Sequence, residues 1–252
     1  MAINKRLIVF LLIITALAIF SIYYPKLTGN ATNTNVNYEK ETAVLNRVID
    51  GDTIVVTGDT IGNLTHIRLL GINTPEKKMP YADDAANFLK QFVNKTIELE
   101  RDKTDLDKYQ RKLRYIFFED RLINLEIVEK GLANAYMLDG LKYSDAFLNA
   151  EAQARNFGVG IWQKSSEKCS SCILLKNLNP INETFILKNN CDFNCELSGW
   201  FVKDAGRNTL YLSILQANQE KLFQSKKGVW ADAGDEFFLF DSSGKLVLYY
   251  KY

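Results

Sequence analysis

Residues 67–76 (IRLLGINTPE) constrain the fold of this chain more than any other stretch. An apolar strand pattern carries one arginine, Arg68, and reaches Gly71, where the chain turns. Two residues with oxygen atoms that can bind a metal, Asn73 and Thr74, follow directly. The carboxylate of Glu76 comes next, after a proline. A strand end that brings an arginine and acidic oxygens together predicts a functional site on a rigid sheet.

The residues around this stretch alternate between short β-type runs and amphipathic helices. Turn signals and β-branched residues bound five predicted strands, at 43–49, 53–57, 64–70, 97–101 and 112–118. Apolar residues at helical spacing predict three helices, at 82–93, 122–130 and 144–158. Short strands with interposed helices predict a small α+β barrel of the oligonucleotide-binding (OB) type with five strands and three helices.

Charged side chains near residues 67–76 suit phosphodiester chemistry. Asp52 follows an Asp-Gly turn upstream, and Arg111 ends a charged loop downstream. A guanidinium fork meets the paired oxygens of a phosphodiester with two parallel hydrogen bonds, which a lysine cannot do. Calcium accepts carboxylate, amide and carbonyl oxygens in irregular geometry. Singly, Arg68 would be an ordinary salt-bridging residue and Asp52 a turn former, but their conjunction predicts metal-assisted attack on a phosphodiester.

Three runs in this order resemble the staphylococcal nuclease family: VIDGDT at 48–53, RLLGINTPE at 68–76 and DKYQR at 107–111. Further similar pieces follow at 131–133, 151–154 and 160–162, so the resemblance covers about 43–163. It implies a five-stranded barrel with three helices. It also implies calcium-dependent cleavage of DNA and RNA, with single-stranded or unwound substrates preferred.

The resemblance implies roles for individual residues. The implied catalytic residues are the phosphate-binding Arg68 and Arg111 and the carboxylate Glu76. The implied calcium ligands are Asp52, Asn73 and the main-chain carbonyl of Thr74. The implied substrate contacts are Lys108, Tyr109 and Tyr136.

The chain also departs from the family pattern. Asn73 stands in place of an aspartate, which removes one negative charge and predicts weaker calcium binding. Gln110 stands in place of a glycine, so we expect a different backbone in that loop. Residues 42–164 hold 17 basic and 18 acidic residues, a net charge of −1, which predicts weaker substrate binding. These departures keep an alternative open, a weak or silent barrel that binds nucleic acid or protein in an envelope interaction protein.

The N-terminus has the pattern of a targeting segment. Lys5 and Arg6 precede an apolar run at 7–24, interrupted only by Thr15 and Ser21. The pattern predicts a membrane anchor or signal peptide at 1–25, and the bulky residues after it favour the uncleaved anchor. The positive flank places the N-terminus in the cytoplasm and the rest outside, anchored to the cell membrane or secreted. A polar, flexible linker is predicted at 26–41.

A second domain is predicted at 169–252, after a nuclease-like domain at 42–164. Six β-rich runs recur there between glycines, which predicts an all-β sandwich. Several phrases resemble a lamin-tail domain, an immunoglobulin-like sandwich: LNP at 178–180, LSGW at 197–200, VKD at 202–204 and DSSG at 241–244. The resemblance implies a binding module without catalytic residues, whose partner the sequence does not name.

All four cysteines lie at the start of this second domain. An even number in an exported chain favours disulfides. If 173–178 and 184–190 form a hairpin, Cys172 meets Cys191 and Cys169 lies near Cys195. A zinc site made by the four cysteines is the alternative.

The sequence thus predicts an exported, membrane-anchored, calcium-dependent endonuclease with a C-terminal accessory module. We expect it to be a monomer that contacts the membrane only through its N-terminal helix.

Overall fold

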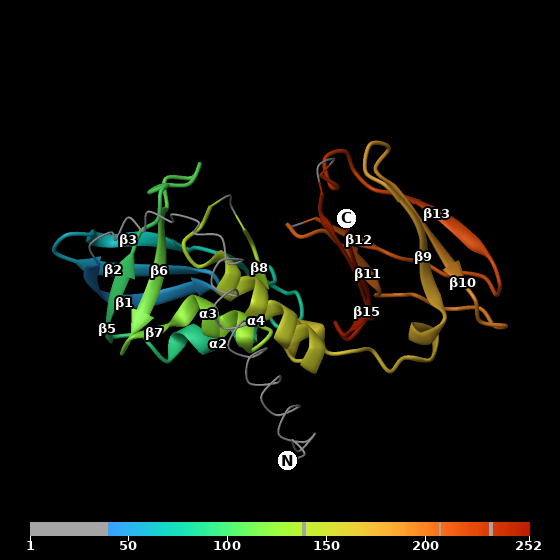
Figure 1. Ribbon diagram of the computed structural model, residues 1–252. Helices are drawn as coiled ribbons and strands as arrows, with labels where there is room; N and C mark the ends of the chain where they lie inside the picture. Colours follow the sequence, from blue (N-terminus) through green and yellow to red (C-terminus); the bar gives the residue numbers. More distant parts are fainter. Residues whose placement is uncertain (1–39, 138–139, 207, 232–233) are drawn as a thin grey trace, which may run out of the picture. The chain divides into compact units, whose positions relative to one another are not determined.

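The computed structural model describes residues 40–137, 140–206, 208–231 and 234–252 (Figure 1). The predicted anchor or signal segment at 1–25 and residues 26–39 of the predicted linker lie outside these ranges. Among the residues described, no helix is long and apolar enough to cross a membrane. The described residues all belong to one compact unit.

A closed barrel forms the first half of this unit. Its strands are β1 (Glu41–Asp50), β2 (Thr53–Gly58), β3 (Gly62–Leu69), β5 (Thr96–Glu100) and β6 (Lys112–Phe118). The short β7 (Arg121–Leu122) pairs antiparallel with the end of β6. Neighbouring strands are antiparallel in the order β3-β2-β1-β5-β6, and a parallel pairing of β3 with β6 closes the ring. The predicted five-stranded barrel is therefore confirmed.

Alternating burial explains why these segments form barrel strands. In β1, Ala43 and Leu45 are buried, whereas Thr42 and Val44 are exposed. Ile54 and Val56 of β2 are buried in the same apolar cluster. A period of two puts every second side chain inside the barrel, and β-branched residues fill that interior well.

Three helices gather beside the barrel (Figure 1). They are α2 (Ala82–Lys90), α3 (Ile123–Glu129) and α4 (Ser144–Phe157). The α2 helix ends earlier than the predicted 93, because the chain turns into a left-handed residue at Asn94 (φ 64°). Gly158 (φ 64°) ends α4, as the sequence predicts.

A short pair of strands fixes the stretch after Gly71. β4 (Ile72–Asn73) pairs with β8 (Asn134–Ala135), so Asn73 lies opposite Asn134. Gly71 has φ 77°, and a side chain there would meet the ring of Phe147 at 2.6 Å. The turn therefore requires glycine for its conformation and for its close packing against α4.

Two further sheets form the second half. One has the order β13-β10-β9, with β9 (Ile173–Asn179), β10 (Thr184–Asn189) and β13 (Glu220–Gln224). The other has the order β12-β11-β14-β15, with β11 (Phe201–Lys203), β12 (Thr209–Tyr211), β14 (Glu236–Phe240) and β15 (Leu246–Lys251). The ring of Phe185 on β10 lies 5.2 Å from that of Phe237 on β14, and one buried apolar cluster includes residues of both sheets.

The predicted β-rich runs all fall in or beside these strands, but β13 was not among them. Its sequence, EKLFQ, exposes Glu220, Leu222 and Gln224 and buries only Phe223. Pairing with β10, not an apolar run, makes it a strand. The predicted boundary at 164–169 and the lamin-tail resemblance stay predictions.

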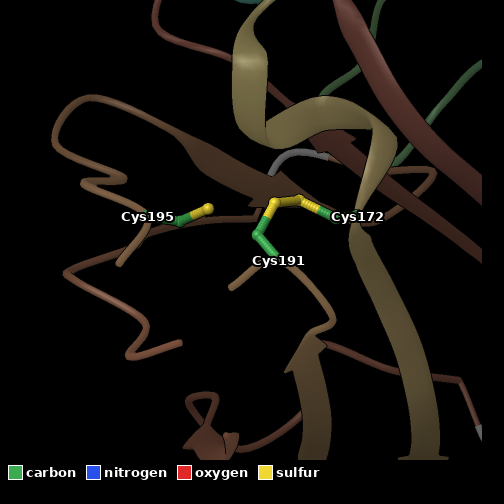
Figure 2. A group of neighbouring side chains, drawn as sticks. All are labelled: Cys172, Cys191 and Cys195. Atoms are coloured by element: carbon green, nitrogen blue, oxygen red, sulfur yellow. A yellow bond between two sulfur atoms is a disulfide. The ribbon is translucent and has the colours of Figure 1, made fainter. Parts of the chain in front are cut away.

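The four cysteines pair as the hairpin argument predicts. Figure 2 shows the bond between Cys172 and Cys191, together with Cys195. Cys172 is bonded to Cys191 and Cys169 to Cys195, with Cα–Cα distances of 5.5 and 5.8 Å. The sulfurs of Cys172, Cys191 and Cys195 lie within 4.8 Å of one another, but disulfide sulfurs are not the thiolates that bind zinc. The structure therefore supports the disulfides and not the zinc alternative.

The barrel half and the sandwich half share an apolar cluster. Trp162 of the 3₁₀ turn η1 (Gly160–Trp162) is fully buried against Phe238 and Tyr249 of the sandwich, with ring distances of 5.7 and 5.3 Å. The backbone N–H of Leu246 donates to the carbonyl of Gln163 at 2.7 Å. A second 3₁₀ turn, η2 (Lys168–Ser171), leads into β9. These contacts join the two halves through side chains and backbone alike.

Candidate functional site

A cavity of about 510 Å³ opens at the end of the barrel where β3 turns. Six of the predicted site residues line it: Arg68, Asn73, Lys108, Tyr109, Arg111 and Tyr136. One lining residue, Gly206, comes from the sandwich. The cavity thus unites residues from β3, β4, the loop before β6 and the segment after β8.

Arg68 is held in a buried cluster of oxygen atoms. Its Nη2 lies 3.1 Å from Oδ2 of Asp52 and 3.5 Å from Oδ1 of Asn73. Its Nη1 donates to the carbonyl of Leu69 at 2.6 Å. Oδ2 of Asp52 also accepts from the backbone N–H of Thr74 at 3.3 Å. Four of the predicted metal and catalytic residues therefore meet within hydrogen-bonding distance.

Arg111 reaches the same region from the loop before β6. Its Nε donates to Oδ2 of Asp107 at 2.7 Å, and its Nη1 donates to the hydroxyl of Thr53 at 3.2 Å. Thr53 in turn donates to Oδ1 of Asp52 at 3.0 Å. Thr53 thus links the Arg111 side to the Arg68 cluster.

Asp107 orients Arg111, a role that the motif comparison did not assign. Its Oδ1 accepts from the backbone N–H groups of Tyr109 and Arg111 at 2.8 and 2.9 Å. Burial opposes its ionisation, but hydrogen bonds from Arg111 and Tyr109 outweigh burial and lower the pKa of Asp107. An aspartate four residues before the arginine was the sequence signal for this pair.

The loop keeps the backbone that a glycine would favour. Gln110 has φ 63°, in the left-handed region. A left-handed residue therefore stands at the glycine replacement, and the expected change of the loop stays a prediction. The left-handed conformation persists at a steric cost on the order of 1 kcal/mol.

Glu76 lies half-buried on the segment between β4 and α2. Its carbonyl accepts from the backbone N–H of Met79 at 2.9 Å, which fixes the turn that follows. Nearby on β1, burial and the charge of Asp52 raise the pKa of Asp50. Glu76 is not among the residues that line the 510 Å³ cavity.

The remaining predicted substrate contacts are accessible. The exposed fractions are 62% for Tyr109 and 43% for Tyr136, and Lys108 is exposed as well. The Tyr109 ring lies 5.1 Å from Nζ of Lys108 and 5.5 Å from the guanidinium of Arg111. An aromatic face flanked by cations suits stacking on a base beside a phosphate.

The oxygen atoms of the buried cluster fit calcium chemically. Asp52 offers a carboxylate, Asn73 an amide oxygen and Thr74 a main-chain carbonyl, which are the hard donors that calcium binds. Asp52, Asn73 and Thr74 are at most 6% exposed, so backbone packing limits their movement.

The structure also brings in a contact that no motif indicated. Nδ2 of Asn73 donates to the carbonyls of Ala205 and Gly206, at 2.9 and 3.4 Å. These two residues lie in the sandwich, more than a hundred positions away in the chain. No local pattern in the sequence could have indicated them.

The comparisons with known proteins agree with this geometry. The family model described as "Staphylococcal nuclease homologue" matches residues 66–164. A thermonuclease of Staphylococcus hyicus is 30% identical over 161 residues, which are 60% of this chain and 94% of the relative. A thermonuclease of Staphylococcus intermedius is 31% identical over 162 residues, covering 60% and 95%. The endonuclease YncB of Bacillus subtilis is 37% identical over 131 residues, covering 48% and 61%.

Nearly the whole length of the two thermonucleases therefore aligns with this chain, at 30% and 31% identity. The prediction of a nuclease hydrolase is confirmed at the level of the family: the chain belongs to the staphylococcal nuclease family.

Proposed function

We propose that this chain is an exported, calcium-dependent endonuclease that hydrolyses phosphodiester bonds of DNA and RNA. The observation that carries the proposal is that Arg68, Arg111 and Asn73 line the same cavity. Two guanidinium groups in one cavity match the two non-bridging oxygens of a phosphodiester and the charge they gain in the transition state.

The arginines bind and stabilise the phosphate. Arg68 is anchored by Asp52 and Arg111 by Asp107, so neither guanidinium has to be ordered when the substrate arrives. Donors that are already oriented stabilise the developing charge without a reorganisation cost.

Glu76 is the proposed acceptor of the proton from the attacking water. Asp52, Asn73 and the carbonyl of Thr74 are the proposed calcium ligands. When bound, calcium would polarise a phosphoryl oxygen and orient the water.

The exposed side of the cavity is proposed to hold the nucleotide strand. Lys108 supplies a cation for the backbone, and Tyr109 and Tyr136 supply rings for bases. Bases are available for stacking only when they are unpaired, which favours single-stranded or unwound substrates.

Export is supported by the two disulfides, because disulfides persist in oxidising compartments. We propose that residues 1–25 anchor the protein to the cell membrane, with the nuclease and sandwich outside, and that the protein is monomeric.

The silent barrel is the second candidate. It is favoured by the fact that both arginines already pair with carboxylates, Asp52 and Asp107. Such pairs lower the net positive potential that a phosphate would meet.

Digestion of single-stranded DNA and of RNA, with excess calcium and with a chelator, separates the candidates. Calcium-dependent shortening of both polymers is the result we expect. Binding of either polymer without cleavage at any calcium concentration supports the silent barrel, and full activity in chelator contradicts the calcium role.

A further inference from the structure

The strongest unassigned feature is the turn between β11 and β12 (residues 204–208, of which 207 is outside the described residues), which meets the nuclease site. Every other described residue that lines the 510 Å³ cavity belongs to the barrel half, yet Gly206 of this turn lines it as well. The turn is also the source of the two carbonyls that accept hydrogen bonds from Asn73.

These two carbonyls determine how the Asn73 side chain is oriented. A carbonyl only accepts hydrogen bonds, so the nitrogen of the amide has to face Ala205 and Gly206. The amide oxygen then faces the other way, toward Nη2 of Arg68 at 3.5 Å and the cluster that contains Asp52. The sandwich therefore selects which atom Asn73 presents to the proposed calcium site.

The turn is built rigidly enough to do this. Oδ1 of Asp204 accepts from the backbone N–H of Asn208 at 2.9 Å, and Oδ2 accepts from its side-chain amide at 2.6 Å. The backbone N–H of Ala205 donates to Oδ1 of Asp235 at 3.1 Å. Nζ of Lys203 donates to the carbonyl of Asp204 at 2.8 Å. Asp204 is only 4% exposed, so its hydrogen bonds are shielded from water.

A charged residue next to the turn, Lys203, lies close to the segment that carries Glu76. Lys203 precedes the turn and lines a small cavity of about 30 Å³ together with Pro75, the neighbour of Glu76. Burial lowers the pKa of Lys203, while Asp204, Glu236, Asp235 and Glu76 oppose that effect by attraction. Lys203 is thus attracted to the charge of Glu76, in addition to the hydrogen bonds between the turn and Asn73.

The same geometry explains why asparagine suits position 73. An aspartate has no donor and would place carboxylate oxygens against the carbonyls of Ala205 and Gly206. That arrangement leaves two carbonyls unpaired and brings like partial charges together. A barrel packed against this turn needs a side chain with a donor at one end and an oxygen at the other.

We propose that the 204–208 turn is a positioning element of the nuclease site: its carbonyls orient Asn73 as a calcium ligand, and Gly206 closes one end of the substrate cavity. This inference rests on the proposed calcium-dependent function. It makes the sandwich a part of the active site and not only an accessory module.

Calcium titration by calorimetry on the full chain tests the proposal. Asp235→Ala removes the acceptor that holds Ala205, and we expect calcium affinity to fall roughly 3- to 10-fold. Asp235→Asn retains an oxygen acceptor for Ala205 and should restore most of the affinity. Glu183→Ala is the matched control, because Glu183 holds a different sandwich turn through the backbone N–H groups of Val229 and Trp230. This control should leave calcium affinity unchanged.

A double-mutant cycle shows whether the turn acts through Asn73. Calcium affinity of Asn73→Ala and of the double variant Asn73→Ala/Asp235→Ala should be equal within error. Full additivity of the two single effects, or unchanged affinity in Asp235→Ala, would overturn the proposal.

The Asn73→Ala and Asp235→Ala cycle is also measured without calcium, with the shift in melting temperature as the readout. If Asp235→Ala does not fold, Asn208→Ala replaces it as a milder change in the same turn. Non-additive shifts with Asn73→Ala support the contact, and additive shifts overturn it. A wild-type chain that fails to bind calcium at all refutes the proposed calcium function, while the calcium-free cycle still decides whether the turn holds Asn73.

Discussion

At the scale of single residues, the site depends on side chains whose charges are already paired. Arg68 lies against Asp52 and Arg111 against Asp107, and Thr53 links the two pairs. A guanidinium carries several N–H groups in one plane, so a bond from one of them to a carboxylate fixes the orientation of the others. The two carboxylates therefore orient the arginines.

Replacing either arginine by lysine tests this orientation. We expect Arg68→Lys and Arg111→Lys each to reduce kcat/KM by roughly 100- to 1,000-fold, because the charge remains but the fork is lost. Steady-state hydrolysis of single-stranded DNA gives the values, and circular dichroism checks the fold. Arg121→Lys is the control, since Arg121 is exposed and pairs with Glu126 on the barrel. Near-normal rates in both site variants would contradict the catalytic assignment.

Asn73→Asp separates the two roles of this side chain. Without calcium, we expect the free energy of unfolding to fall by about 1–3 kcal/mol, because two donors to the sandwich are lost. With calcium, we expect a larger rise in melting temperature than in the wild type, because the added charge strengthens the cation site. Thermal unfolding with and without calcium measures both effects. An unchanged stability in chelator would argue against the Asn73 contact.

At the scale of elements, the hairpin of β9 and β10 organises the sandwich. Cys172 precedes β9 and Cys191 follows β10, so their disulfide ties the open end of the hairpin. The Cys169–Cys195 disulfide encloses the same hairpin from η2 to the segment beyond β10. Both disulfides therefore hold the β9–β10 hairpin closed at its open end.

Removing one bond should weaken that element measurably. For Cys172→Ser/Cys191→Ser we expect a loss of roughly 3 kcal/mol in the free energy of unfolding, by the chain-entropy estimate for a loop of this length. Denaturant titration under non-reducing conditions gives the value. Reductant should lower the stability of the wild type further than that of the variant, and a wild type insensitive to reductant would contradict the disulfide assignment.

At the scale of the whole molecule, a buried carboxyl lies where the barrel meets the sandwich. Glu151 of α4 is 3% exposed and accepts from the backbone N–H of Ala135 at 2.8 Å. Burial, and next the charge of Glu236 on β14, raise the pKa of Glu151 to about 7, against the opposing effects of Arg155 and Lys251. The junction of the two halves therefore carries a group that titrates near neutral pH.

This carboxyl makes stability depend on pH. The pKa of Glu151 in the folded state lies above its ordinary value, so the folded state binds more protons than the unfolded state. The contribution of Glu151 to the free energy of unfolding is therefore complete in acid, and it is lost as the pH rises from about 4.5 to about 7. The difference corresponds to roughly 3 kcal/mol. Glu151→Gln keeps an oxygen for the Ala135 N–H but cannot ionise, so it should be more stable than the wild type at pH 8 and similar at pH 4.5. Denaturant titrations at both pH values make the comparison, and equal stability at pH 8 would count against the shift.

Much of the barrel and of its site could be predicted from the sequence. Strand alternation, helix periodicity and glycine turns are local, so β1, β2, β3, β5, β6 and the three helices follow from their own residues. The candidate residues Arg68, Asn73 and Arg111 were found because their spacing is local as well. The hairpin pairing of the cysteines was predictable for the same reason, since the strands and the cysteines are neighbours in the chain.

Other features were decided only by tertiary structure, because they depend on residues far apart in sequence. β13 is a strand through its pairing with β10, Trp162 is buried by Phe238 and Tyr249, and Glu151 titrates near neutrality beside Glu236. The replacement of aspartate by Asn73 reads in the sequence as a weakened metal ligand. Only packing against Ala205 and Gly206 gives the amide a second use, because a side chain's hydrogen-bond partners depend on what folding brings next to it.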